Sequence, residues 1–271
     1  MKKWMAVVFG FRCFFVFAQA SNNPKAYNLE ELQSIIDSAH VKGTLLIYDE
    51  NQNAVYCNDF VDCQIGYLPA STFKICNTMI GLETGAIKSK DSLFYWDGNK
   101  RMFSIWERDM NLREAFQSSC VPCFQEVARK IGPREMKKWL LKLKYGNNIE
   151  INEENIDQFW LKGEFRISAE EQIIFLKSLL NKRLPISPET QNHMWGIMRV
   201  EGDSSLFAKT GWTQVDGKDQ GWYVGIKKAD SNNYIFALHI ENIDNPDFMN
   251  ARKRIALEGL EFVIQLEEQS E

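Results

Sequence analysis

The sequence predicts a single α+β domain, in which a central antiparallel sheet is flanked by N- and C-terminal helices and carries an all-helical insertion. Stretches with strand character fall into two groups, one towards each end of the chain: residues 43–48 and 54–57, then 205–211, 221–227 and 234–241. The late stretches follow one another with short connections, which favours antiparallel pairing. Residues from about 91 to 182 have helical patterns and are rich in tryptophan and phenylalanine, so we expect them to form the insertion.

Local signals support the individual elements. Asn28 is expected to cap the first helix, because Glu31 follows three residues later and apolar residues then repeat at helical spacing. Pro69 precedes a helix that carries Ser71 and Lys74 and ends near Gly85. The other helices are expected at 111–116, 124–131, 134–143, 169–180 and 248–266.

Length and composition set the limits of this interpretation. The chain has 271 residues with 45% hydrophobic content, which is enough for one large domain with a substantial core. No low-complexity linker or internal repeat divides it, so we expect one domain over residues 21–271. The net charge is −4 and there is no basic run, which argues against a nucleic-acid partner.

The first 20 residues have the pattern of a signal peptide. Lys2 and Lys3 precede an apolar run that is too short to span a membrane, and Ala18-Gln19-Ala20 supplies the small residues of a cleavage site. Arg12 within the run is atypical and leaves an uncleaved anchor as an alternative. Cleavage after Ala20 removes three positive charges, giving −4 − 3 = −7, and predicts a periplasmic protein with no stable membrane association.

Five cysteines remain after cleavage, and this odd number leaves at least one outside any intramolecular disulfide. Cys57 and Cys63 are candidates for a disulfide in an oxidising compartment, which the sequence alone does not decide. Cys120 and Cys123 have the spacing of a redox motif, but no thioredoxin-like pattern surrounds them. We therefore interpret them as two small buried thiols.

Metal and histidine chemistry are not favoured. The three histidines are isolated, and neither an H-E-x-x-H pair nor a double C-x-x-C array is present, so we expect no metal cofactor. A serine nucleophile in this chain would therefore need a base other than histidine.

Ser71 and Lys74 form an S-x-x-K motif, which offers such a base. Residues three apart on a helix share a face, so the amine can reach the hydroxyl. Lysine accepts a proton only when neutral, and burial among apolar neighbours lowers its pKa in that direction. The motif alone is weak, because a helix-capping serine followed by a solvated lysine has the same spacing.

Two further elements strengthen the signal. Lys209-Thr210-Gly211 lies in a late strand, and S-x-x-K with K-T-G occurs in penicillin-binding proteins and in one class of β-lactamase. A third element, S-D-N in those families, is expected between the two. Here the candidate is Ser119-Cys120-Val121, in which an apolar valine replaces the asparagine.

With these residues the chain resembles the class D serine β-lactamases, the oxacillinase type, over nearly all of the mature sequence. The resemblance implies the fold of the penicillin-recognising serine hydrolases. It also implies hydrolysis of the amide bond of penicillins, and of other β-lactams that the sequence does not define, through a serine acyl-enzyme. The segments that carry the resemblance are PASTFK at Pro69–Lys74, Ser119-Cys120-Val121, Tyr145-Gly146-Asn147, Trp160-Leu161, Lys209-Thr210-Gly211, GWYVG at Gly221–Gly225, and Arg252.

The resemblance also implies the form of the base. Lys74 is expected to add carbon dioxide and become N6-carboxylysine, with the Trp160 indole N–H as a hydrogen-bond donor to the carbamate. CO2 or bicarbonate is then the only requirement in place of a cofactor, and no glutamate base is needed. The apolar wall expected around Lys74 consists of Phe73, Val121, Phe124, Trp160 and Leu161.

The remaining roles follow from the same resemblance. Ser71 is the nucleophile, and the backbone N–H groups of Ser71 and Trp212 form the oxyanion hole. Ser119 relays a proton to the departing ring nitrogen. Lys209 is counted among the catalytic residues and adds positive charge nearby. The substrate is bound by Thr210, Gly211, Trp212 and Arg252, of which Thr210 and Arg252 hold its carboxylate.

Two rival functions share Ser71, Lys74 and the K-T-G motif. A penicillin-binding DD-peptidase or a β-lactam sensor domain would be acylated without turnover. Val121 in place of asparagine argues against the peptidase, and a sensor should carry several membrane spans. A non-catalytic binding protein would have no use for a desolvated lysine beside a serine. The sequence leaves open the substrate spectrum and whether the protein is a monomer or a homodimer.

Overall fold

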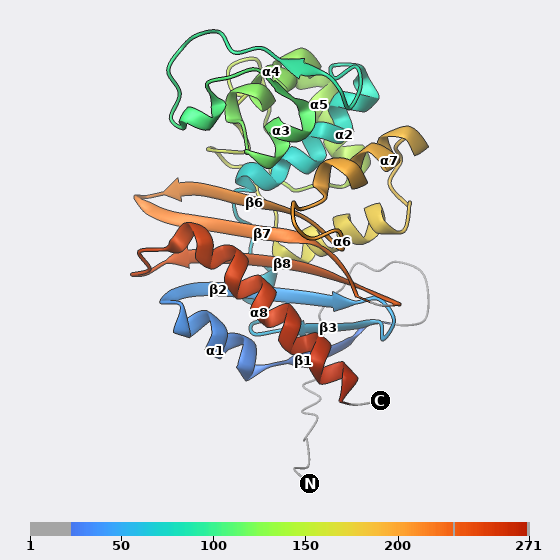
Figure 1. Cartoon of the computed structure of the whole chain (residues 1–271), viewed down its shortest axis with the longest axis vertical. Helices are drawn as coiled ribbons and strands as arrows, with labels where there is room; N and C mark the ends of the chain where they lie inside the picture. The colour runs from blue at the N-terminus through green and yellow to red at the C-terminus, as the bar shows by residue number, and fades with distance from the viewer. Residues whose placement is uncertain (1–22, 230, 270–271) are drawn as a thin grey trace.

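The computed structural model describes residues 23–229 and 231–269, so the predicted signal peptide lies outside the described residues. A six-stranded sheet has the order β1-β3-β2-β8-β7-β6 and combines strands from both ends of the chain, which confirms the predicted α+β class (Figure 1). The strands are β1 (Lys25–Asn28), β2 (Val41–Asp49), β3 (Ala54–Cys57), β6 (Leu206–Val215), β7 (Lys218–Ala229) and β8 (Asn232–Asn242).

Eight helices and a two-stranded ribbon complete the described residues. The helices are α1 (Glu30–Ser38), α2 (Lys74–Thr84), α3 (Leu112–Gln117), α4 (Val121–Ile131), α5 (Pro133–Leu143), α6 (Ala169–Leu180), α7 (Pro188–Met198) and α8 (Phe248–Glu268). The ribbon pairs β4 (Leu93–Phe94) with β5 (Met110–Asn111). Short 3-10 turns occur at Asp62–Gln64, Ala70–Phe73 and Ser104–Trp106.

The sheet is antiparallel except at one edge. Strands β2, β8, β7 and β6 pair in sequence as antiparallel neighbours, as expected. At the far edge β1 runs parallel to β3, an exception to the predicted antiparallel sheet. Residues 25–28 are all exposed, so this strand has no apolar alternation by which the sequence could reveal it.

The sheet separates two apolar cores, which is why its central strands are buried on both faces. Helices α1 and α8 cover one face, where Leu32 and Ile36 of α1 share a core with Ile255 and Val263 of α8 (Figure 1). Helix α6 packs on the opposite face, and helices α2–α5 and α7 gather beyond β6. The N- and C-terminal helices therefore lie on the same side of the sheet.

The first helix begins one residue later than predicted. Its N-cap is Leu29, and Asn28 belongs to β1, so the expected Asn28 cap is wrong. The cause is tertiary: Asn28 pairs with Cys57, and the N–H of Leu29 donates to the Cys57 carbonyl at 2.9 Å. The strand ladder therefore occupies the position that local capping signals assigned to the helix.

Most other predicted helices agree with the structure to within three residues at each end. Helix α4 starts earlier than expected, at Val121, with Pro122 in its first turn. Helix α7 was not predicted, although Ser187 caps it and Pro188 occupies its first position, which is a recognised helix-start pattern. Across the described ranges no helix has both the length and the apolar character needed to cross a membrane.

The cysteine interpretation requires a correction. Cys120 and Cys123 form a disulfide and are not two separate thiols. Because α4 begins at Val121, these residues occupy its N-cap and third helical position, and their Cα atoms are 5.4 Å apart, within disulfide range. No disulfide joins Cys57 to Cys63; the Cys63 thiol donates to the Phe60 carbonyl at 3.2 Å.

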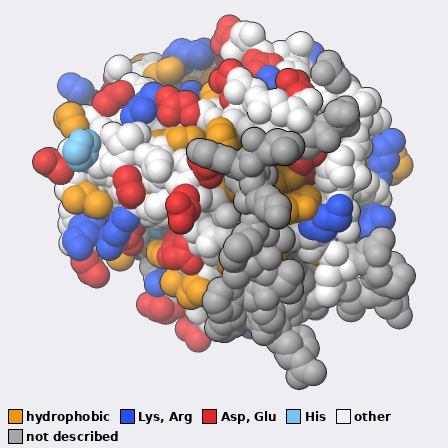
Figure 2. Space-filling view, turned by 90° about the horizontal axis from the view of Figure 1, so that it is seen from below, with side chains coloured by type: hydrophobic (Ala, Val, Ile, Leu, Met, Phe, Trp, Pro, Cys, Tyr) orange, Lys and Arg blue, Asp and Glu red, His pale blue; other side chains and the backbone are white. Residues whose placement is uncertain are grey.

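Acidic and basic side chains are interspersed on the face of the molecule seen in Figure 2, between scattered apolar groups. Among the ion pairs of the described residues, Arg254 and Glu258 lie 3.7 Å apart, four residues apart on α8. Charge of both signs on one face gives no concentrated positive field there.

Candidate active site

The 3-10 turn Ala70–Phe73 holds Ser71 immediately before α2, which begins at Lys74. Ala70 has a φ of 49°, which is unfavourable for a residue with a side chain and is typical of functional sites. The turn is fixed from outside: the Ala70 N–H donates to the Trp160 carbonyl at 3.0 Å, and the Thr72 hydroxyl donates to the Pro69 carbonyl at 2.6 Å. The Ser71 side chain is buried but retains 7% exposure, so its hydroxyl can meet a ligand.

Lys74 lies one turn after Ser71, and its Nζ donates to the Ser71 Oγ at 2.8 Å. Lys74 is fully buried, and burial alone lowers the pKa of its ammonium to about 7. A substantial fraction of neutral amine is therefore present at neutral pH. A lysine in this state can take the proton of a hydroxyl, which an ordinary lysine cannot do.

The five residues predicted to form the apolar wall of Lys74 belong to the helical-side core or pack against it. Phe73, Phe124 and Trp160 are buried in one cluster, against which Val121 and Leu161 pack half-buried. The Lys74 Nζ lies 5.3 Å from the centre of the Phe124 ring. The Phe73 and Trp160 rings stack at 5.1 Å, which fixes the indole against the start of α2.

The indole N–H of Trp160 is a buried donor without an acceptor in the described part of the chain. Its Nε1 is buried, and among the residues that the structure describes it has no hydrogen-bond partner. A buried, unsatisfied N–H costs about 1–3 kcal/mol, so such groups call for an explanation. An acceptor group attached to the buried Lys74 amine would give this N–H a hydrogen-bond partner.

A second serine–lysine pair involves Ser119 and Lys209. The Lys209 Nζ donates a short hydrogen bond to the Ser119 Oγ, and a further one to the Thr210 carbonyl at 3.0 Å. Burial lowers the pKa of Lys209, and the positive charges of Lys74, Arg252 and Lys253 lower it further. Ser119 itself has a φ of 55°, so both catalytic candidates among the serines are associated with strained backbone.

Strand β6 distributes the K-T-G residues between the two faces of the sheet. Side chains alternate along a strand, and Phe207 belongs to the helical-side core whereas Ala208 belongs to the core beneath α8. Lys209 therefore points towards the helices, where it meets Ser119, and Thr210 points towards the side of α8. Because β6 is an edge strand, both side chains stand at the border of the sheet.

Gly211 allows β6 to approach the nucleophile turn closely. A Cβ at this position would lie 3.0 Å from the Pro69 carbonyl oxygen and 3.2 Å from a methyl carbon of Thr72. Two residues further along the same face of β6, the Thr213 hydroxyl donates to the Leu161 carbonyl at 3.0 Å. These contacts hold the edge of the sheet beside Ser71. A role for Gly211 in spacing is thus directly visible.

Arg252 reaches the same edge from α8. Its guanidinium donates a short hydrogen bond to the Gly211 carbonyl and another to the Met249 carbonyl at 2.9 Å. Burial lowers the pKa of Arg252 to about 10, which leaves it charged at neutral pH. Its side chain crosses Gly221, where a Cβ would lie 2.5 Å from the Arg252 Cδ.

Trp212 is the residue after the K-T-G motif on β6, paired in register with Gly221. Its indole Nε1 donates to Asp219 at 2.9 Å, which turns the side chain towards the β6–β7 hairpin. The backbone of Trp212 lies on the edge strand next to Gly211.

Two residues that sequence reasoning missed connect these parts. Asn77 is fully buried and donates to the Phe124 carbonyl at 3.1 Å, which joins α2 to α4. Gln172 of α6 donates to the Thr72 hydroxyl at 3.0 Å. Asn77 follows Lys74 by three residues on the same helix face, and this spacing is a signal that could have identified it.

Tyr145 and Gly146 pack against residues that support the site. Tyr145 is buried and packs against Phe73, with ring centres 6.0 Å apart. Gly146 has a φ of 71°, and a Cβ there would lie 2.8 Å from the Arg166 carbonyl oxygen. Packing and backbone conformation therefore explain why a tyrosine and a glycine occupy these two positions, without a direct role for either in catalysis.

No group of three or more histidine, cysteine, aspartate or glutamate side chains suited to a metal ion occurs within residues 23–229 and 231–269. The chemistry available from the described side chains is that of two serines, two desolvated lysines and one arginine.

Comparison with known proteins assigns this arrangement to a family. Residues 42–258 match the penicillin binding protein transpeptidase domain. The chain is 39% identical over 227 residues to β-lactamase OXA-10 of Pseudomonas aeruginosa, covering 82% of this chain and 84% of that protein. It is 40% identical over 224 residues to β-lactamase OXA-48 of Klebsiella pneumoniae, covering 81% and 82% respectively.

Solved structures give the same result in three dimensions. The class D β-lactamase YbXI from Nostoc superposes with a TM-score of 0.80 at 38% identity, covering 85% of this chain and 97% of that one. A class D β-lactamase from Sebaldella termitidis superposes with a TM-score of 0.82 at 32% identity, covering 89% and 98%. On the identity to known members and the likeness to their solved structures, the chain belongs to the class D serine β-lactamases.

Proposed function

We propose that this protein hydrolyses the amide bond of β-lactams through an acyl-enzyme on Ser71, with Lys74 as the base in both half-reactions. As a class D β-lactamase it is a β-lactam hydrolase. The observation that carries the residue assignment is the 2.8 Å contact between Ser71 Oγ and the Nζ of a fully buried lysine.

In the acylation step Lys74 takes the proton of Ser71, and Ser71 Oγ attacks the lactam carbonyl. The backbone N–H groups of Ser71 and Trp212 stabilise the oxyanion, each contributing roughly 3 kcal/mol by analogy with comparable sites. Ser119, hydrogen-bonded to Lys209, delivers a proton to the ring nitrogen as the C–N bond breaks. Lys209 remains close to the reacting centre as a source of positive potential.

Substrate recognition is assigned to the edge of β6. Thr210 and Arg252 hold the carboxylate of the substrate, and Lys209 adds charge. In the present structure Arg252 donates to the Gly211 and Met249 carbonyls, so its guanidinium is already oriented at this edge. Binding a carboxylate there exchanges neutral acceptors for a charged one, which strengthens the hydrogen bonds.

We further propose that Lys74 acts as N6-carboxylysine. The residues present fit this group: the buried Trp160 Nε1 lacks a partner within the described chain and would donate to it, and the apolar wall keeps the amine neutral for reaction with CO2. A carboxylate on Nζ supplies an anionic base that can activate the deacylating water. Lys74 thereby takes the role that glutamate has in class A enzymes.

One experiment separates this function from the acylation trap of a DD-peptidase or sensor. The protein is mixed with a chromogenic cephalosporin and with a penicillin, each with and without added bicarbonate. Many turnovers are expected, with activity falling below about pH 7 as Lys74 becomes protonated and partly recovering when bicarbonate is supplied. A single stoichiometric burst under all conditions would favour the trap.

The setting of the enzyme is also a proposal. We propose export to the periplasm by the N-terminal signal peptide, cleavage after Ala20 and action as a monomer or homodimer. Mass spectrometry of periplasmic extracts of an expressing bacterium tests the first two points, because a mature N-terminus at Ser21 is expected. Detection of the uncleaved chain in the membrane fraction would contradict them.

A further inference from the structure

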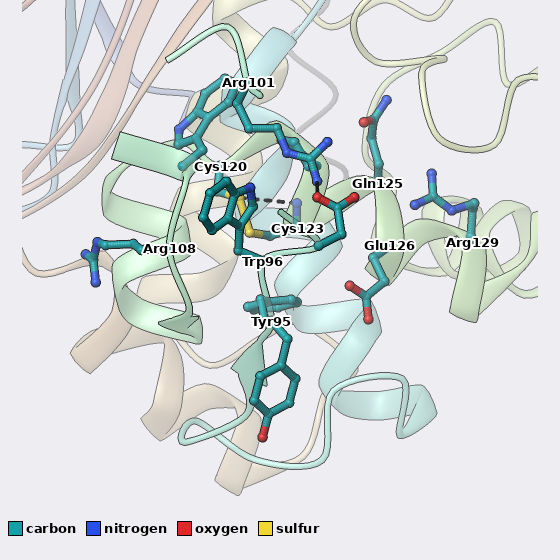
Figure 3. Close-up of a pocket in the computed structure, with 13 residues that line it drawn as sticks. Tyr95, Trp96, Arg101, Arg108, Cys120, Cys123, Gln125, Glu126 and Arg129 are labelled. Carbon is teal, nitrogen blue, oxygen red and sulfur yellow. Dashed lines mark hydrogen bonds and ion pairs between the residues drawn. A yellow bond between two sulfur atoms is a disulfide. The ribbon is translucent and has the colours of Figure 1, made fainter. Parts of the chain in front are cut away.

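A pocket of about 360 Å³ opens on the helical part of the molecule, and the Cys120–Cys123 disulfide forms part of its wall (Figure 3). Ser71, Lys74 and Lys209 are not among its lining residues, so it is separate from the catalytic cleft.

The charged groups around this pocket are already neutralised. Arg101 pairs with Asp97 at 2.6 Å, and Arg129 pairs with Asp157 at 2.6 Å. The pocket therefore presents no strong net field to an ionic ligand. Its distinctive chemical group is the disulfide, since a disulfide can exchange with a thiol while the neighbouring side chains are unreactive.

The disulfide is directly connected to a catalytic residue. Cys120 follows Ser119, whose φ of 55° is unfavourable, and the Cys120 N–H donates to the Ala115 carbonyl at 2.8 Å. Trp106, which lines the same pocket, donates to the Ser118 carbonyl at 2.9 Å. The strained turn that aims Ser119 at Lys209 is thus held between the indole of Trp106 and the disulfide.

We propose that Cys120–Cys123 is a thiol-reactive redox pair, reached by small thiols through this pocket, and that its reduction impairs the positioning of Ser119. A small thiol is the expected reactant because the disulfide is recessed: Cys123 is 8% exposed and Cys120 is 1% exposed. The effect on catalysis rests on the function proposed above, whereas the exchange reaction does not.

Because Cys123 is more exposed than Cys120, the attacking thiol is expected to bond to the Cys123 sulfur. An attacking thiolate forms a bond to the Cys123 sulfur, the Cys120–Cys123 bond breaks, and its electron pair remains on the Cys120 sulfur. That sulfur already accepts the Cys123 backbone N–H at 3.2 Å at the start of α4, a position that favours negative charge. A second thiol then attacks the first thiol's sulfur, which releases an external disulfide and leaves the protein as a dithiol.

The other cysteines provide internal controls. Cys76 is fully buried, and burial raises the pKa of its thiol, so it is expected to be inert. Cys57 and Cys63 are also buried, with 0% and 2% exposure. Reaction confined to position 123 would therefore reflect the pocket and not general thiol reactivity.

The exchange is tested with glutathione on two matched single variants of the folded protein. Cys120→Ser leaves the Cys123 thiol and retains a side-chain oxygen for the helix cap, whereas Cys123→Ser leaves the Cys120 thiol. After treatment with oxidised glutathione, peptide mass spectrometry is expected to find the adduct on Cys123 in the first variant and at least tenfold less on Cys120 in the second. Equal labelling, or labelling only at the other cysteines, would overturn the proposal.

The catalytic consequence is read from the rate of Ser71 acylation by a penicillin, followed by intact mass. Reduction of the wild type is expected to slow acylation by about tenfold, in line with the sensitivity of catalysis to small displacements, and reoxidation should restore it. The double variant Cys120→Ser/Cys123→Ser should show the slow rate and no response to thiols. An unchanged rate in the fully reduced wild type would overturn the link to Ser119.

Acylation is measured without requiring turnover, so the two proposals fail separately. Absence of hydrolysis with normal acylation would overturn the proposed function and leave the redox pair standing. Hydrolysis that is indifferent to the state of the disulfide would do the reverse.

Discussion

The two serine–lysine pairs of this enzyme are alike in chemistry and different in construction. Ser71 and Lys74 lie about one turn apart, so the 3-10 turn Ala70–Phe73 and the start of α2, which are continuous in the chain, set their distance. Ser119 and Lys209 are 90 residues apart, and their contact requires the turn before α4 to be held against the edge strand β6.

Their electrostatic surroundings differ as well. The pKa of Lys74 is lowered by burial alone, whereas that of Lys209 is lowered by burial and by the positive charge of Arg252, Lys253 and the protonated form of Lys74. Lys209 donates to the Thr210 carbonyl in addition to Ser119. On the function proposed above, the apolar surroundings of Lys74 favour a base at the first pair, and the charged groups around the second pair serve proton delivery and anion binding.

The largest effect is expected from removal of the base at the first pair. Lys74→Ala should lower turnover by about 10³-fold or more, because general-base catalysis is worth up to about 10⁴ and both half-reactions use it. Any acyl-enzyme that still forms should persist for hours in intact-mass spectra. Lys177→Ala is the control, because that half-buried lysine donates to Tyr48 and lies outside the site. Rapid loss of the acyl adduct in Lys74→Ala would show that another group activates water.

The second pair should behave as a unit. Ser119→Ala and Lys209→Ala are each expected to slow acylation by about 10²-fold, because each removes one partner of the same hydrogen bond. The double variant should be little worse than the more severe single one, since effects within one network do not add. Single-turnover kinetics measure the three rates. Strict additivity would mean that the two residues act independently.

The first pair should also make stability depend on pH. With a pKa of about 7 in the folded protein and 10.5 as its model value, Lys74 is neutral when folded and charged when unfolded between these limits. The unfolded state then binds more protons, so the free energy of unfolding should rise with pH from about 7 to 10, by roughly 1 kcal/mol per pH unit.

Lys74→Met isolates this contribution. The variant should be more stable than the wild type at pH 7, and its advantage should shrink as the pH rises, because methionine has no proton to lose. Urea denaturation in bicarbonate-free buffer at pH 7, 8 and 9 gives the difference. A constant difference across this range would mean that Lys74 is solvated and charged in the folded protein.

The smallest predicted effect concerns the anion-binding side of the second pair. Gly221→Ala places a methyl group against the Arg252 side chain, which is expected to shift the guanidinium and raise the KM for penicillins several-fold with a smaller change in kcat. Gly196→Ala is the matched control, because a Cβ there meets nothing within 4 Å and helix α7 tolerates alanine. Equal KM values in the two variants would argue against a carboxylate-binding role for Arg252.

Much of the fold could be predicted because its signals are local. Apolar runs and short connections identify strands β2, β3, β6, β7 and β8, and helical periodicity identifies most of the helices. The exposed strand β1 has no such signal, because it depends on pairing with β3. The Asn28 cap was wrong for the same reason, since that ladder takes the residue before the helix can use it.

For the site, too, the features that depend on local sequence could be predicted. The spacing of Ser71 and Lys74 in the sequence determined their contact, because a helical turn brings residues three apart together whatever surrounds them. The order of the motifs along the chain further indicated the family.

Only the tertiary structure decided that Lys74 is dry, that Lys209 reaches Ser119, and that Cys120 and Cys123 are joined. Desolvation of an amine depends on side chains from several distant segments, among them Phe124 and Trp160, which pack together in three dimensions. The physical reason is that a pKa responds to everything within a few ångströms, whereas a motif in the sequence specifies only neighbours along the chain.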